Sequence, residues 1–212
     1  MTAQRRPPAW LDPLLDGVAG ISASDLTRFV PPDGAARRSA VLIAFGDGEQ
    51  GPDVLLIERA HDMRSHAGQP AFPGGAVDPT DDGPVAAALR EAAEETGLDP
   101  RGVEVVAVLP DLYLPPSDFV VTPVIGWWWA PSQVGPLDPA EVASVHRVPL
   151  SVLTDPRHRY RVRHPSGFVG PAFEVHGLVV WGFTGGLLDR LVYLAGWEQE
   201  WDRDDVRDLT IG

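Results

Sequence analysis

The chain has 212 residues, which is enough for one domain with a sizeable core and short extensions. Its 17 basic and 30 acidic residues give a net charge of −13, which argues against nucleic acid as a partner because no excess positive charge would neutralise a phosphate backbone. Cysteine is absent, so disulfides, thiolate catalysis and cysteine-based metal sites are excluded. No apolar run is long enough for a signal peptide or a membrane helix, and we expect a cytoplasmic protein without a membrane partner.

The first 36 residues are interpreted as an N-terminal extension. Residues 10–15 have the spacing of a short amphipathic helix, and residues 24–26 begin a second helical candidate. Two apolar runs, 39–45 and 54–59, flank a stretch rich in glycine and bounded by proline, which predicts a hairpin.

The second half of the chain favours strands. Strand candidates are residues 103–109, 119–129, 142–148, 157–164 and 173–180. Pro123 within the second of these indicates a sheet edge or a bulge. Residues 183–195 predict a closing helix, and the acidic residues 198–212 predict a tail that docks weakly or not at all. We expect an α/β fold with one mixed sheet covered by helices, formed by residues 37–197.

Three consecutive tryptophans, Trp127, Trp128 and Trp129, end one predicted strand. Because side chains alternate between the faces of a strand, at least one ring should lie on each face. We interpret them mainly as core or interface packing. The alternative is that one ring stacks on a purine base.

The most informative stretch runs from Gly74 to Leu98. Its second half predicts a helix on which Glu91, Glu94 and Glu95 share one sector, while apolar and small residues line the other. Carboxylates on one face repel each other, and a hard divalent cation such as Mg²⁺ or Mn²⁺ would offset that repulsion. The two glycines at the start allow backbone groups to approach the same ion. A solvated acidic face is the alternative interpretation.

This stretch resembles the Nudix box, in which a glycine and an acidic loop precede Arg-Glu-apolar-x-Glu-Glu-x-Gly-apolar. The helical half is complete, but the interval from Gly75 to Arg90 is one residue longer than usual, so the loop acid falls at Asp81 or Asp82. The resemblance implies an α/β/α sandwich with a Mg²⁺ or Mn²⁺ cofactor. It also implies metal ligands at Glu91, Glu94, Glu95 and Gly74, a substrate contact at Gly75, and catalytic roles for Arg90 and Glu91.

The segment before the box resembles the coenzyme A pyrophosphatase branch of the same family. The matching positions are Arg59, Arg64, Gly68, Phe72, Pro73, Gly74 and Gly75. One departure is Ala60, where the branch usually has serine. Arg59 and Arg64 could bind phosphate groups through their guanidinium forks, or form surface ion pairs. His66 could contact phosphate or pack within the loop. The resemblance implies cleavage of coenzyme A or an acyl derivative to 3′,5′-ADP and 4′-phosphopantetheine or its acyl form.

The general base is left open between two glutamates. Glu91 lies on the box helix, and Glu141 follows a loop with proline and glycine just before a predicted strand. An ordinary exposed carboxylate is the alternative for Glu141. Other functions that fit are hydrolysis of a dinucleotide or a sugar nucleotide, or a ligand sensor without catalysis. The expected partner is a small diphosphate compound, and a homodimer is the assembly we consider.

Overall fold

A computed structural model describes residues 5–27, 29, 37–62, 67–115 and 117–209 of the protein. The helices are α1 (Asp12–Val18), α2 (Ala23–Leu26), α3 (Gly83–Thr96), α4 (Leu150–Thr154) and α5 (Gly182–Leu194), with 3-10 turns η1 (Pro100–Gly102) and η2 (Pro156–His158). The first strands are β1 (Arg37–Gly48), β2 (Gly51–Arg59), β3 (Pro70–Ala71), β4 (Gly74–Ala76), β5 (Val103–Val108) and β6 (Leu112–Leu114). The remaining strands are β7 (Phe119–Trp128), β8 (Val142–Pro149), β9 (Arg159–Arg163), β10 (Val169–Val175), β11 (Leu178–Val180) and β12 (Val206–Asp208).

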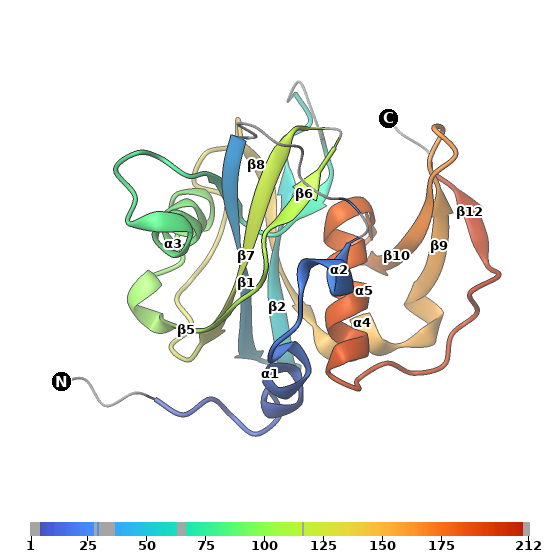
Figure 1. The fold of residues 1–212 in the computed structure, drawn as a ribbon, viewed down its shortest axis with the longest axis horizontal. Helices are drawn as coiled ribbons and strands as arrows, with labels where there is room; N and C mark the ends of the chain where they lie inside the picture. Colours follow the sequence, from blue (N-terminus) through green and yellow to red (C-terminus); the bar gives the residue numbers. More distant parts are fainter. Residues whose placement is uncertain (1–4, 28, 30–36, 63–66, 116, 210–212) are drawn as a thin grey trace.

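The long strand β1 organises a mixed sheet in the order β3-β2-β1-β7-β5 (Figure 1). It pairs antiparallel with β2 and β4 and parallel with β7, while β8 pairs with β2 and β6 with β7. The β1–β2 hairpin predicted from the sequence is present, but both strands continue further, so only Glu49 and Gln50 lie between them.

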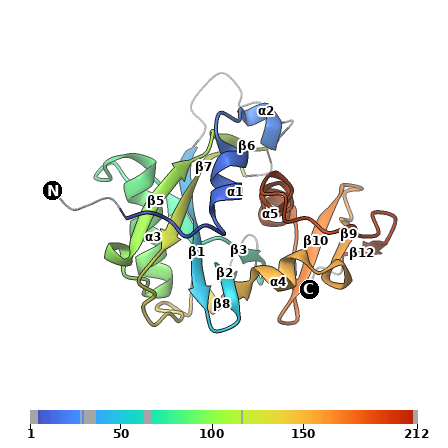
Figure 2. The same cartoon turned by 90° about the horizontal axis from the view of Figure 1, so that it is seen from below.

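Helices cover both faces of this sheet (Figures 1 and 2). Ala87, Ala88 and Ala92 of α3 pack on one face against small and branched residues of β1. On the other face, α1 and α5 contribute leucines to a larger core cluster with Ile43 and Phe45. Because alanine has a short side chain, α3 lies close to the strands. The predicted α/β/α sandwich with a central mixed sheet is confirmed.

The predicted helix at residues 10–15 corresponds to α1, displaced slightly toward the C-terminus, and the second candidate is the single turn α2. Leu11 and Leu14 are fully buried, so this part of the N-terminal segment belongs to the core. The domain limits at 37 and 197 remain a proposal. No helix within the described ranges is both long and apolar enough to cross a membrane.

Pro123 does not mark a sheet edge, so that alternative was wrong, and the register irregularity between β5 and β7 lies at Val105/Ala107, opposite Gly126 and Ile125 rather than opposite Pro123. Strand β7 has β1 on one side and, on the other, β6 up to Val121 and β5 from Val124 onward. The missing N–H of Pro123 therefore falls where one partner strand replaces the other, so it costs no ladder hydrogen bond there. Trp127 and Trp128 belong to the two opposite core clusters, as alternation predicted.

A second sheet, in the order β11-β10-β9-β12, follows the first and was not predicted. Residues 173–180 form parts of two strands rather than one, because His176 and Gly177 both adopt positive φ and turn the chain. The expectation of a weakly docked tail was also wrong for the described residues. Strand β12 pairs in parallel with β9, and Trp201 is 9% exposed.

The tail is held by Arg159, a guanidinium almost completely buried at 2% exposure. It binds Asp189 Oδ1 at 2.5 Å and Glu198 Oε1 at 3.2 Å. It also lies over the rings of Phe173 and Trp201, at 5.1 and 4.7 Å. Since one buried positive charge binds carboxylates from α5 and from the tail, the described tail residues belong to the folded unit.

Replacing Arg159 by alanine should therefore destabilise the protein strongly. It would leave Asp189 and Glu198 without their shared partner in a mostly desolvated place, at a cost of about 2–4 kcal/mol in the free energy of unfolding. Urea titration measures this difference. The matched control is Arg163→Ala on the same strand, whose exposed pair with Asp208 should contribute little. Similar losses in both variants would contradict the assignment.

Candidate active site

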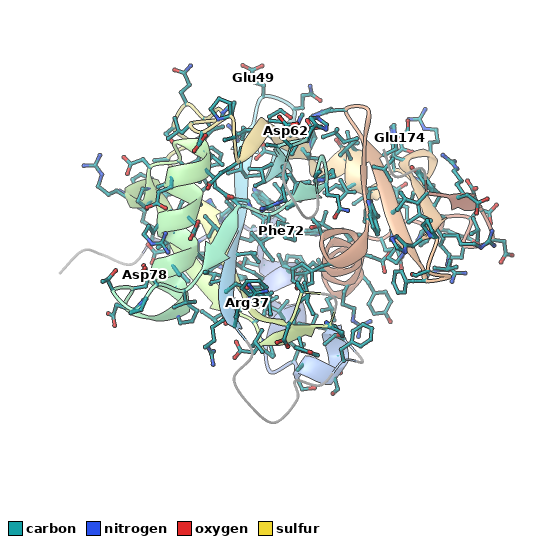
Figure 3. All side chains as sticks on the ribbon, turned by 90° about the horizontal axis from the view of Figure 1, so that it is seen from above. Arg37, Glu49, Asp62, Phe72, Asp78 and Glu174 are labelled. Carbon is teal, nitrogen blue, oxygen red and sulfur yellow. The ribbon has the colours of Figure 1, made fainter. Side chains whose placement is uncertain are left out.

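The candidate site lies where α3 faces the short strand β4. In Figure 3, Phe72 marks the chain just before β4 and Asp78 marks the loop that leads to α3. The helix begins with Gly83 at φ 81° followed by a proline in its first turn, and it ends at Gly97 in the left-handed conformation. These two signals fix which residues of the box are helical.

Gly74 connects the sheet to the helix. A side chain at this position would begin 2.3 Å from the Ala40 carbonyl oxygen and 2.6 Å from the Val41 Cα, so only glycine allows this approach to β1. Its backbone N–H donates to Glu95 Oε2 at 2.8 Å. The prediction that Gly74 itself binds the metal is untested, and the hydrogen bond shows only that Gly74 contacts Glu95, one of the predicted ligands.

Glu95 is a buried carboxylate, with 6% of its surface exposed. Burial raises the pKa of Glu95 to about 7, and the negative charges of Glu91 and Glu141 act in the same direction. The Gly74 N–H and the positive charge of Arg59 oppose that pKa rise only in part. A carboxylate in this environment needs a further positive charge to stay ionised at neutral pH.

Glu91 lies against Gly75. A Cβ added to Gly75 would be 2.4–2.5 Å from the carboxylate atoms of Glu91, so this glycine makes room for the carboxylate. Burial raises the pKa of Glu91 and outweighs the hydrogen bond from Arg90. The predicted substrate contact at Gly75 is untested, but its steric relation to Glu91 is clear.

Arg90 cross-links the site, and its predicted catalytic role is untested. Its Nε and Nη2 form a bidentate pair with Asp81, and Nη2 also donates to the Ala76 carbonyl oxygen. Its Nη1 donates to Glu91 Oε1 and Glu94 Oε2 at 3.0 and 2.9 Å. These five bonds match the five N–H donors of a guanidinium, so Arg90 has the contacts of a positioning residue.

The one-residue loop insertion leaves this arrangement intact. Of the two candidate loop acids, Asp81 binds Arg90, whose hydrogen bond is the main cause that lowers the pKa of Asp81. Asp82 is the residue before α3 and makes no side-chain cap hydrogen bond. The structure therefore selects Asp81 as the loop acid that supports the helix.

Glu94 differs from the other two helix glutamates. Its side chain is 59% exposed and is bound by Arg90. Within the described part of the chain, no three acidic or histidine side chains are already gathered as a metal cage. The donor set still fits a hard divalent cation, because burial raises the pKa values of Glu91 and Glu95, and neighbouring carboxylate charges from Glu91, Glu94 and Glu141 add to that rise. The metal-ligand assignments stay predictions.

Strands β2 and β8 bring Arg59 and Glu141 to the same place. Arg59 is the last residue of β2 and pairs with Val142, the first residue of β8. The Ala60 N–H then donates to the Glu141 carbonyl oxygen at 2.9 Å. The charges of Arg59 and Glu141 both act on Glu95, which places these residues at the site. Arg64 and His66 lie outside the described residues.

Sequence reasoning missed a polar group beside Arg59. Ser144 of β8 donates to Glu58 Oε2 at 2.6 Å, and its hydroxyl lies 2.6 Å from His146 Nε2. The only signal in the sequence is that Ser144 and His146 alternate with apolar residues along a predicted strand. Their partner on β2 could be found only from the strand register.

The sequence matches the NUDIX domain family over residues 36–166. It is 40% identical over 168 residues to the uncharacterized Nudix hydrolase NudL of Enterobacter sp., covering 76% of this chain and 83% of that protein. The protein of the same name from Salmonella newport is 41% identical over 165 residues, which cover 76% of this chain and 83% of that protein. This chain belongs to the Nudix family and is a Nudix hydrolase.

A solved structure shares the fold. The Nudix hydrolase RenU of M. smegmatis aligns with a TM-score of 0.51 over 82% of this chain and 97% of that chain, at 20% sequence identity. At this sequence identity the match supports only a shared arrangement of sheet and helices.

Substitution of Gly75 by alanine tests the contact with Glu91. The new methyl group would displace the Glu91 carboxylate, and we expect kcat to fall by about tenfold or more, since small misplacements of a reacting group are costly. Steady-state kinetics with Mg²⁺ supply the measurement. The control is Gly186→Ala in α5, where an added Cβ meets no atom within 4 Å. Unchanged kcat in Gly75→Ala would contradict the proposed placement.

Proposed function

We propose that this Nudix hydrolase is a divalent-metal-dependent diphosphatase that cleaves coenzyme A or an acyl derivative to 3′,5′-ADP and 4′-phosphopantetheine or its acyl form. The observation that carries the proposal is the buried Glu95 carboxylate. It is bonded to Gly74 and lies within electrostatic reach of Glu91, Glu141 and Arg59.

The proposed metal holders are Glu91, Glu94 and Glu95, all on α3. A bound Mg²⁺ or Mn²⁺ would polarise phosphate oxygens and lower the pKa of a coordinated water. Glu95 is fixed by the Gly74 N–H, and Glu91 is fixed between Gly75 and Arg90. Arg90 holds the loop and two of the glutamates in place, which keeps the carboxylates oriented before a substrate arrives.

Hydrolysis adds the elements of water across the P–O–P bridge. The water oxygen bonds to one phosphorus, the bridging oxygen leaves with the other phosphate, and a carboxylate accepts the water proton. We assign that proton to Glu141, because its side chain is exposed at the edge of the site while Glu91 is bound by Arg90. Glu91 is the second candidate for the base.

The substrate assignment rests on the segment 55–75. Arg59 carries a positive charge next to the buried glutamates, where a diphosphate would meet it. Phe72 is buried at 3% exposure and Gly68 adopts φ 65°, so two positions of the branch motif have structural roles here. Ala60, the departure from the motif, is buried at 4% exposure. The homodimer stays a prediction.

The metal assignment predicts a large effect of Glu95→Gln. The amide keeps the size of the side chain but removes its charge, and we expect kcat to fall by about 10²-fold, or roughly 2.7 kcal/mol of barrier. Mn²⁺ binding, measured by electron paramagnetic resonance, should weaken in parallel. Glu94→Gln is the matched comparison and should lose less, because Glu94 is exposed and held by Arg90. Near-normal metal binding in Glu95→Gln would reject this ligand.

The substrate assignment is tested with a panel of diphosphates. We expect the purified protein with Mg²⁺ to cleave coenzyme A, with products identified by mass. Arg59→Ala should reduce that cleavage more than cleavage of a simple dinucleoside diphosphate, because the arginine would contact a group that the simpler compound lacks. Equal losses would indicate a general diphosphate clamp. If only a dinucleotide or a sugar nucleotide is cleaved, that compound replaces coenzyme A as the assigned substrate. No cleavage at all would favour a ligand sensor.

A further inference from the structure

The pairing of β2 with β8 contains one extra residue next to the site. The register runs without interruption from Asp53 opposite Pro149 to Glu58 opposite Ser144, and then Arg59 pairs with Val142. Ala143 therefore has no partner on β2, which makes it a β-bulge. Bulges of this kind bend a strand and redirect the side chains that precede or follow them, and they are frequent beside active sites.

The bulge decides where Glu141 lies. Without the extra residue, Ala143 would stand opposite Arg59, and Glu141 would be carried about 3.3 Å further along the strand direction. With the bulge, the Glu141 carbonyl oxygen instead receives the Ala60 N–H, and the Glu141 charge acts on Glu91 and Glu95. A shift of this size would move the Glu141 carboxylate out of reach of the water whose proton it is proposed to accept.

A hydrogen-bonded group fastens the last regular pair before the bulge. The Ser144 hydroxyl donates its single proton to Glu58 Oε2 at 2.6 Å. His146 Nε2, 2.6 Å from the same hydroxyl oxygen, must then be the donor to it. The second oxygen of Glu58 lies 3.2 Å from His61 Nε2, in the turn after Arg59. Glu58 thus contacts Ser144 on β8 and His61 in the turn after β2. Its side chain is 15% exposed.

We propose that Ser144 and Glu58 are positioning residues for the reaction: their hydrogen bond fixes the bulge at Ala143 and through it the place of the Glu141 carboxylate. This inference rests on the proposed function of Glu141 as proton acceptor. Ser144 lies outside the box and outside the segment 55–75, and Glu58 lies within that segment but is not one of its matching motif positions. Their effect is exerted through the backbone at Glu141 and Ala60.

The first test is a double-mutant cycle between Ser144→Ala and Glu141→Gln. Ser144→Ala should lower kcat about tenfold with little change in KM, and it should add less than about twofold when Glu141→Gln is already present. A general structural defect would instead lower kcat equally in both backgrounds, and that result would overturn the proposal. Full kcat in Glu141→Gln would overturn it as well. Ser144→Thr keeps the hydroxyl and should restore the rate.

The second test needs neither metal nor substrate. The Ala60 amide should exchange its hydrogen at least about tenfold faster in Ser144→Ala. The amide of Leu42 in β1, which donates to the Pro73 carbonyl oxygen, should be unaffected. Ser166→Ala is the matched control, because it removes a serine–histidine contact of 2.7 Å in a distant turn. Unchanged exchange at Ala60 would overturn the role of the hydrogen bond.

The two claims can fail separately. If coenzyme A is not cleaved but another diphosphate is, the substrate proposal fails and the cycle is measured with the diphosphate that is cleaved. If none is cleaved, the proposed function fails, while hydrogen exchange at Ala60 still shows whether Ser144 fixes the bulge. The catalytic part of the inference is then overturned with the function on which it rests.

Discussion

The site depends on one hydrogen bond between the sheet and the helix, from the Gly74 N–H to the buried Glu95 carboxylate. Burial alone would favour the neutral acid. The pKa of Glu95 stays raised because the Gly74 hydrogen bond and the Arg59 charge offset only part of the effect of burial. Such an arrangement is costly for a purely structural carboxylate. It is reasonable for a carboxylate whose negative charge is balanced by a bound cation. The environment of Glu95 therefore supports a metal-dependent function.

Small residues make this contact possible. Alanines on the inner face of α3 let the helix approach β1, and the two glycines of β4 leave room for the Val41 backbone and for the Glu91 carboxylate. Arg90 then uses all five of its donors to bind the loop, the strand and two glutamates. The acidic side chains are consequently held by the fold and by one arginine, and they need little reorganisation when a ligand binds.

Local patterns in the sequence predicted the parts of the site that are close along the chain. The pattern in the second half of 74–98 predicted the helix and the shared sector of its glutamates, and the apolar runs predicted most strands of the first sheet. Contacts between distant segments were not predictable in this way. The docked tail depends on buried Arg159, the turn at His176 divides what looked like one strand, and the bulge at Ala143 depends on register. The role of Arg90 as a cross-link also required the position of Asp81.

The central claim is that the α3 carboxylates bind a divalent cation beside β4. The most direct measurement is anomalous X-ray scattering from crystals of the full chain soaked in Mn²⁺. We predict a strong anomalous peak within coordination distance of Glu95 and of at least one other α3 glutamate, with Arg90 still bound to Asp81. A fully occupied Mn²⁺ elsewhere, with no peak beside Glu95 at saturating Mn²⁺, would contradict this account.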